Sequence, residues 1–371
     1  MESRVLFNNP IVTLQGGPPT HLPFLYDELL KKITVSNYYV GRKTDNESLV
    51  YKVADRIRDY WAFYKKIKEF KPNLVHHNSA FDGKTILRDF PIVILCKYLR
   101  LPVLVKIHGS SDSMLKMRNP IILFFVRLFL NQITKIGVLS DIEKEEFRNI
   151  YNINPDKIAV VKNIIKPVFF TTVRKESVNP TFLFVSRIVK KKGIYDLMDA
   201  IPKIVSTLPD ARFYIVGNGE EVLDLERKIN ASQFKDHIIL IKSLDNNDLV
   251  NLHAFVWAII FPTCFPEGMP MVIAEAMAAG VPVITTRTRF SLSYMKEFEH
   301  CLYIEKNNPD SIVEKVLDLS KNDTLRISSA ENNKTLAKNF SSEVVAVEYI
   351  QLYENMIQSY FNLQAKKSNA E

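Results

Sequence analysis

The sequence has few cysteines and no long apolar run. Its 371 residues include three cysteines, whose spacing fits no metal-binding motif and whose small number fits a reducing compartment. The most apolar run, 121–130, is interrupted by Arg127 and is too short to cross a bilayer. The first residues lack the basic, apolar and small-residue order of a signal peptide, because RVLF from Arg4 is typical of a strand. We therefore expect a cytoplasmic protein without a membrane-spanning helix.

Two ligand-binding motifs are also missing. The chain has no Asp-x-Asp pair to hold a divalent metal ion, and no G-x-G-x-x-G follows the first predicted strand of either half. The second absence argues against a nicotinamide-dependent dehydrogenase. Glycine itself is scarce, with 11 residues, so each one is expected to mark a special requirement of the backbone.

Positive charge is concentrated in the first half of the chain. The formal net charge is +8, and residues 1–172 carry 26 Lys and Arg against 16 Asp and Glu. Such an excess favours an anionic neighbour, either a membrane surface or a phosphorylated substrate. Within this half, residues 60–71 interleave aromatic side chains with lysines. This segment fits either a membrane interface or an amphipathic core helix with a solvated basic face.

Strand-like and helix-like segments alternate along the chain in two series. The pattern predicts an α/β protein with two Rossmann-like parallel-sheet domains, each with helices on both faces of its sheet. We place the N-terminal domain at 1–172 and the C-terminal domain at 173–341, with a linker near 176–180. We also expect a helix over 89–99 and a long last helix over 342–360.

Several polar or glycine-rich motifs follow predicted strands, at the edge where open α/β sheets bind ligands. Gly16-Gly17 and Gly217-Asn218-Gly219 fit phosphate-binding turns, although each motif alone is weak evidence and a plain tight turn is the simpler explanation of Gly16-Gly17. His108 ends another predicted strand, where it serves either a ligand or an internal hydrogen bond.

The segment 261–286 combines two carboxylates with a predicted helix start. Glu267 lies in a loop that contains proline and glycine, and Glu275 lies about one turn into the helix that follows Pro270. The start of this helix offers free backbone N–H groups, which suit an anion.

Together these motifs resemble glycosyltransferase family 4, whose members are retaining nucleotide-sugar enzymes with the two-domain B-type fold. The resemblance covers nearly the whole chain and is strongest over 181–286. It implies that the domains face each other across a cleft, and that the last helix crosses back to the N-terminal domain. The residues that carry it are Ser186-Arg187, Lys192-Gly193, Ile215-Val216-Gly217-Asn218-Gly219, Pro262-Thr263, Glu267-Gly268-Met269-Pro270 and Glu275-Ala276-Met277-Ala278.

The resemblance also implies a role for each matching residue. Arg187 and Lys192 would bind the donor diphosphate, which suits metal-independent transfer. Glu267 and His108 would lie beside the donor sugar, and Glu275 would bind the ribose hydroxyls. The remaining donor-binding candidates are Gly16, Gly17, Gly217, Gly219, Lys242, Gly268, Met269, Pro270, Met271 and Val272.

We thus expect a hexosyltransferase without a metal or other cofactor that uses a UDP- or GDP-linked sugar. Its acceptor would be a glycan or lipid-linked glycan of surface polysaccharide or glycolipid synthesis, bound by the basic N-terminal half. That half would also contact the anionic inner face of the cell membrane peripherally, and no nucleic-acid partner is expected. Two alternatives remain: a non-catalytic partner of another transferase, and a nucleotide-sugar epimerase. The presence of both phosphate-binding cations and both carboxylates argues against the non-catalytic partner.

Overall fold

The computed structural model describes residues 3–8, 21–40, 49–109, 114 and 116–368, which form two compact units. The first unit comprises Met1–Ile164 and Ser342–Glu371, and the second comprises Ile165–Ser341. Each unit contains one six-stranded sheet in which all neighbouring strands are parallel. The predicted fold, with two Rossmann-like units, is therefore confirmed.

The first sheet has the strand order β2-β1-β3-β4-β5-β6. Its strands are short and mostly buried, because helices cover both faces. Alternate residues of β1 point to opposite faces: Val5 and Phe7 join one core cluster, and Leu6 joins the other. The strands are β1 (Arg4–Asn8), β2 (Thr34–Tyr38), β3 (Leu74–Ser79), β4 (Val103–Ile107), β5 (Lys135–Val138) and β6 (Ile158–Val160).

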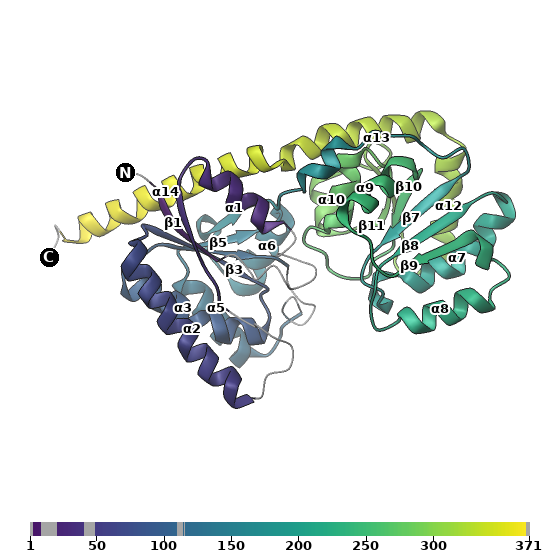
Figure 1. Ribbon diagram of the computed structural model, residues 1–371. Coiled ribbons are helices and arrows are strands. Elements are labelled where there is room, and N and C mark those ends of the chain that lie inside the picture. The colour runs from purple at the N-terminus through teal and green to yellow at the C-terminus, as the bar shows by residue number, and fades with distance from the viewer. Residues whose placement is uncertain (1–2, 9–20, 41–48, 110–113, 115, 369–371) are drawn as a thin grey trace. The chain divides into compact units, whose positions relative to one another are not determined.

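Helices α1 and α14 pack together on one face of this sheet, and the other helices of the first unit share the second core cluster (Figure 1). The long α14 returns to this unit after the whole second unit has been completed, as the sequence predicted. Tyr349 and Tyr353 fix it there, because they are fully buried beside His76 of β3. The helices are α1 (Leu22–Leu30), α2 (Leu49–Phe70), α3 (Gly83–Tyr98), α5 (Pro120–Gln132), α6 (Asp141–Tyr151), η2 (Pro155–Lys157) and α14 (Ser342–Ser368).

The second sheet has the order β12-β11-β10-β7-β8-β9. In this unit helix α7 packs against α12, and helix α10 packs against α13. Its strands are β7 (Thr181–Val185), β8 (Arg212–Val216), β9 (Ile238–Ile241), β10 (Ala258–Phe261), β11 (Val283–Thr286) and β12 (Cys301–Ile304). Its helices are η3 (Pro167–Thr171), η4 (Lys190–Lys192), α7 (Ile194–Thr207), α8 (Val222–Ala231), η5 (Lys235–His237), α9 (Asn246–Phe255), α10 (Met271–Ala279), α11 (Arg289–Tyr294), α12 (Pro309–Ser320), α13 (Asp323–Ala337) and η6 (Lys338–Phe340).

The chain passes between the units earlier than the sequence suggested. The division lies between Ile164 and Ile165, so the predicted boundary after residue 172 and the predicted linker at 176–180 both fall inside the second unit. The physical reason is that η3 packs against α9 and α10, where the Phe169 ring lies 5.3 Å from that of His253. This short helix therefore belongs to the second core.

Helix α3 begins six residues before the predicted start at Asp89. The carboxylate of Asp82 accepts hydrogen bonds from the N–H groups of Lys84 and Thr85, and the Thr85 hydroxyl accepts one from the Asp82 N–H. This capping box starts the helix, and Pro91 lies inside it rather than in its first turn.

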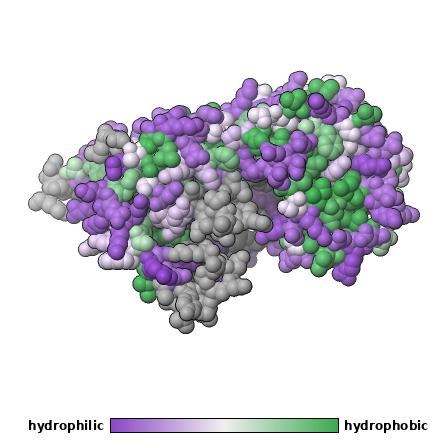
Figure 2. Space-filling model, viewed as in Figure 1, coloured by the Kyte–Doolittle hydropathy of each residue, from purple (hydrophilic) through white to green (hydrophobic). Residues whose placement is uncertain are grey.

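Hydrophilic residues cover most of the surface seen in Figure 2. Among the described helices, none combines the length and the apolar character needed to cross a membrane.

Candidate functional site

The candidate site in the second unit is built on loops that follow β7, β8 and β10, which are neighbours in the sheet. Glycines bring these loops into backbone contact. A Cβ atom on Gly193 would overlap the carbonyl of Pro262, and one on Gly217 would overlap the carbonyl of Ser186. Both glycines also have positive φ angles, of 76° and 148°, which other residues rarely adopt. The loops are therefore held together at the carboxyl edge of the sheet.

Lys192 and Glu267 form an ion pair at this edge. The Lys192 Nζ lies 2.5 Å from Glu267 Oε1, and the two side chains are 15% and 16% exposed. The hydroxyl of Thr263 donates a second hydrogen bond to the same carboxylate oxygen at 3.0 Å. The pair is thus oriented by the protein, yet it remains accessible to a ligand.

Further contacts fix the loop that carries Glu267. Two rings, those of Phe261 and Phe265, flank the Lys192 ammonium with centroids 5.3 and 5.1 Å away. The Arg289 guanidinium donates to the carbonyl of Pro266 at 2.9 Å. Because these partners come from β10, the loop and α11, the position of Glu267 does not depend on the loop alone.

The same edge of the sheet carries donors without a partner among the described residues. Arg187 follows β7 and is exposed, and its guanidinium has no hydrogen-bond or ion-pair partner among the described residues. The N–H groups of Met271 and Val272, the first two residues of α10, donate to no described acceptor, since the first helical bond runs from Ile273 to Pro270. This edge of the second sheet therefore carries cationic and N–H donors that suit an anionic ligand.

The other predicted donor-binding residues lie in different surroundings. Gly268, Met269 and Pro270 are buried in the loop before α10. Gly219 packs against the backbone of Ile188, which makes its role structural in the described chain. Lys242 is half exposed after β9 and pairs with Glu226 of α8 at 2.9 Å, so the structure does not bring it to the pair. Two further candidates, Gly16 and Gly17, lie outside the described residues.

Glu275 is buried on α10 and has a partner that sequence analysis missed. The Lys166 Nζ lies 3.0 Å from Glu275 Oε1, across 109 positions of sequence. Burial raises the pKa of Glu275, and the ammonium of Lys166 opposes that rise. Arg289 was missed as well, whereas Thr263 belongs to the Pro262-Thr263 motif of the resemblance, without an assigned role. No local pattern in the sequence indicates that Lys166 meets Glu275 or that Arg289 meets the carbonyl of Pro266.

In the first unit, His108 follows β4 and is held by Asn78 of β3. The Asn78 amide donates to the carbonyl of Asn8 at 2.6 Å, so its oxygen accepts from His108 Nε2 at 2.7 Å. Burial, with the nearby charge of Lys106, lowers the pKa of His108 well below its usual value. His108 is therefore a neutral Nε2–H imidazole whose buried Nδ1 has no hydrogen-bond partner among the described residues.

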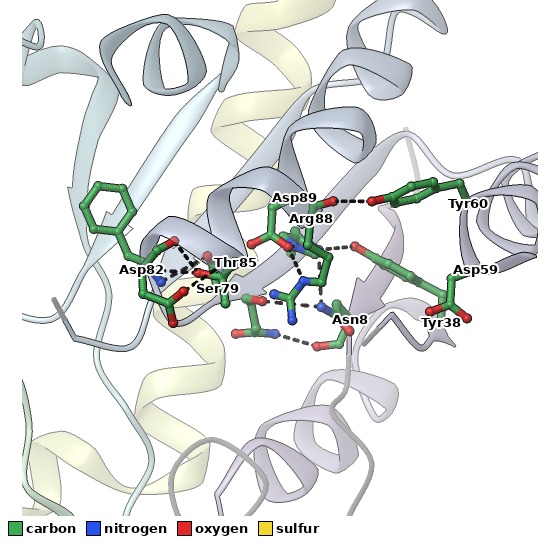
Figure 3. A network of polar contacts seen from close by, with 12 residues as sticks. Asn8, Tyr38, Asp59, Tyr60, Ser79, Asp82, Thr85, Arg88 and Asp89 are labelled. Atoms are coloured by element: carbon green, nitrogen blue, oxygen red, sulfur yellow. Dashed lines mark hydrogen bonds and ion pairs between the residues drawn. The ribbon is translucent and has the colours of Figure 1, made fainter. Parts of the chain in front are cut away.

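A second polar network lies at the same edge of the first sheet (Figure 3). Asp89 Oδ1 lies 3.0 Å from His77 Nε2 and 2.6 Å from Arg88 Nε. On the other side of the imidazole, Tyr38 Oη lies 2.7 Å and Asn8 Nδ2 lies 3.2 Å from Nδ1. Burial alone would raise the pKa of Asp89, but the His77 and Arg88 contacts lower it to about 2. The network lies in the interior, and Asp89 Oδ2 has no hydrogen-bond partner among the described residues.

Over the part of the chain that the structure describes, no group of three or more His, Cys, Asp and Glu side chains is arranged to hold a metal ion. The cationic side chains at the edge of the second sheet have the chemistry that matches a diphosphate. His108 belongs to the first unit and the Lys192–Glu267 pair to the second.

Two family models match consecutive parts of the chain. The model described as Glycosyltransferase Family 4 covers residues 30–168, and the one described as Glycosyl transferases group 1 covers residues 168–336. The Glycosyl transferases group 1 match contains every residue of the candidate site in the second unit except Lys166. Together the two models span most of both sheets.

Individual relatives carry glycosyltransferase names. An uncharacterized glycosyltransferase of Methanocaldococcus jannaschii is 28% identical over 76% of each chain. The UDP-Gal:alpha-D-GlcNAc-diphosphoundecaprenol alpha-1,3-galactosyltransferase of Escherichia coli is 24% identical over 95% of this chain and 90% of its own. Several other relatives are matched over less than half of their length.

Solved structures share the fold. The HepE protein of Anabaena, solved in complex with UDP, has a TM-score of 0.73 and 13% identity, over 95% of this chain and all of its own. At this level of identity the likeness shows the fold alone and leaves the substrate open.

Proposed function

Because the chain belongs to glycosyltransferase family 4, we propose that it transfers a hexosyl unit from a UDP- or GDP-linked sugar to a glycan or lipid-linked glycan, with retention of anomeric configuration. The observation that carries the proposal is the accessible Lys192–Glu267 pair, together with the exposed guanidinium of Arg187, which follows β7 at the same edge of the sheet. Two such cations suit a diphosphate leaving group, and a carboxylate can accept hydrogen bonds from the hydroxyls of a sugar.

In this proposal the donor diphosphate binds between Arg187, Lys192 and the N–H groups at the start of α10. These groups stabilise the charge that develops as the bond between the anomeric carbon and the diphosphate oxygen breaks. The acceptor oxygen bonds to that carbon on the same face, and its proton passes to the leaving phosphate oxygen. Glu267 positions the sugar and stabilises the positive charge of the transition state, without forming a covalent bond. No metal ion enters the scheme.

The Escherichia coli relative supports a nucleotide-sugar donor and a lipid-linked acceptor, since its name specifies both. The first unit supports an acceptor at a membrane. Helix α5 leaves a row of large apolar side chains exposed, among them Phe124 at 62% and Phe125 at 61%. Exposed aromatic residues on a basic domain suit an anionic lipid surface, and residues 1–172 carry the positive excess. We therefore place the enzyme peripherally on such a surface.

Helix α2, which contains most of the aromatic and basic segment 60–71, packs in the core of the first unit. Phe63 and Ile67 are buried against the sheet, while Trp61 is exposed with Lys65 5.6 Å from its ring. This helix fits a core helix with a solvated basic face. The proposed membrane contact therefore rests on α5.

The proposal is tested by measuring the melting temperature of the purified chain with a panel of UDP-, GDP- and ADP-sugars. One donor is expected to raise the melting temperature by several degrees, because it binds only the folded state. The anomeric configuration of the product, determined by NMR, then tests retention. Stabilisation by no donor would favour a non-catalytic partner. A converted donor in the absence of acceptor would favour an epimerase, and both outcomes contradict the proposal.

A further inference from the structure

Lys166 has two polar partners in the interior of the second unit. Its Nζ lies 3.0 Å from Glu275 Oε1 and 3.0 Å from Asn246 Oδ1. The Phe169 ring lies 5.7 Å from the same ammonium. The side chains of Lys166 and Glu275 are 11% and 7% exposed, so water screens this ion pair only weakly.

Glu275 is the only charged residue of α10, whose other residues are apolar. A buried carboxylate without a cation becomes protonated, because desolvation disfavours its charged form. His253 of the adjacent α9 supplies no charge, since burial lowers its pKa to about 4. Lys166 is therefore the cation that keeps Glu275 ionised.

Only one oxygen of Glu275 is occupied by the protein. Oε1 receives the Lys166 ammonium, and Oε2 has no hydrogen-bond donor among the described residues. An ionised carboxylate accepts hydrogen bonds at both oxygens, which matches the two neighbouring hydroxyls of a ribose. A protonated carboxyl group has one donor and fewer acceptor sites, so it fits such a diol less well.

We propose that Lys166 is a positioning residue that holds Glu275 ionised and oriented, so that preference for a ribose over a deoxyribose in the donor nucleotide depends on Lys166. This inference rests on the proposed function, which places the ribose of the donor at Glu275. Asn246 serves the same purpose indirectly, because its side-chain oxygen accepts a hydrogen bond from the same ammonium.

The test measures the dissociation constants of UDP, GDP and their 2′-deoxy analogues by calorimetry, using the full chain. The wild type is expected to prefer the ribonucleotide of its own base by roughly tenfold or more, as for a hydrogen bond to a charged group. K166M and E275Q are expected to reduce this preference to about twofold or less. K166R is expected to restore most of it, because it returns the cation.

A matched control is K203M, which removes an exposed lysine that pairs with Asp310 in the same unit. This variant is expected to keep the wild-type preference. With the cognate nucleotide sugar as donor, K166M is expected to raise KM more than it lowers kcat, whereas general misfolding would lower both the melting temperature and kcat.

Three outcomes overturn the inference. Full preference in K166M would show that Lys166 does not act on the ribose site, although the proposed function would stand. Equal binding of ribose and deoxyribose by the wild type would remove Glu275 from that site. Binding of neither nucleotide by the wild type would instead contradict the proposed function itself.

Discussion

The carboxyl edges of the two sheets carry polar residues of similar kinds but use them differently. In the first unit, His77 lies in the interior, where Asp89, Tyr38 and Asn8 contact its ring. In the second unit, Arg187 has no partner among the described residues, and the neighbouring ion pair is partly exposed. One edge is therefore built mainly for stability, while the other keeps charge available for a ligand.

Buried titratable groups alone therefore do not locate a ligand-binding site. Asp89 has a strongly perturbed environment, with a pKa of about 2, yet its network is buried. Among the described residues of the first unit, the buried atoms without a hydrogen-bond partner include both His108 Nδ1 and Asp89 Oδ2. Exposure of an unpaired donor or acceptor therefore separates a binding edge from a structural one.

The largest expected effect lies at the second edge. R187A and E267Q are expected to reduce kcat/KM by roughly 10²- to 10³-fold, because each removes a charge that acts in the transition state. Both variants are expected to melt close to the wild type, since neither side chain lies in the core. Activity is measured with the donor found in the panel. E305Q, which removes an exposed carboxylate after β12, is the control and should retain full activity. Near-normal turnover in R187A and E267Q would contradict the site assignment.

The second expected effect is on stability and lies at the first edge. D89N is expected to lower the free energy of unfolding at pH 7 by about 3 kcal/mol, because Arg88 and His77 lose their buried partner. The measurement is urea denaturation. The control E145Q removes an exposed partner of Arg148 and is expected to cost at most about 0.5 kcal/mol.

The pH dependence of this effect has a defined sign. The folded-state pKa of Asp89, about 2, lies below the value of about 3.9 in an unfolded chain. Its stabilisation is therefore complete above pH 4 to 5 and is lost as the pH falls toward 2. The difference between wild type and D89N should shrink over that range. A difference that stays constant down to pH 3 would contradict the assigned ionisation.

How well the sequence predicted these edges depended on how local the contacts are. The second edge was predictable in outline, because Glu267, Pro270 and Glu275 lie within one short segment and Lys192 lies in the connection between β7 and α7. Lys166 was not, since it meets Glu275 only after the unit has folded. In the first unit, the hydrogen bond between Asn8 and His77 spans 69 positions, and no periodicity indicates it. Both sheets were predictable from strand–helix alternation, whereas the start of α3 depended on the Asp82 cap.

The smallest expected effect concerns the outer surface of the first unit, where exposed apolar residues lie on α5 instead of at the sheet edge. The purified chain is expected to bind anionic vesicles at low salt and to be released at high salt, since screening weakens its attraction to the lipid. F124S/F125S is expected to weaken binding about tenfold, because burying a phenylalanine contributes roughly 1.5–3 kcal/mol when complete.

The matched control is L223S, which removes an exposed leucine from α8 of the second unit, where Leu223 is 68% exposed. It is expected to bind vesicles as the wild type does. Co-sedimentation with vesicles of stated anionic lipid content measures all three proteins. If L223S weakened binding as much as F124S/F125S, the contact would not be specific to the first unit. If the wild type failed to bind at any salt concentration, the exposed side chains of α5 would face something other than a membrane, and the acceptor would be sought among soluble glycans.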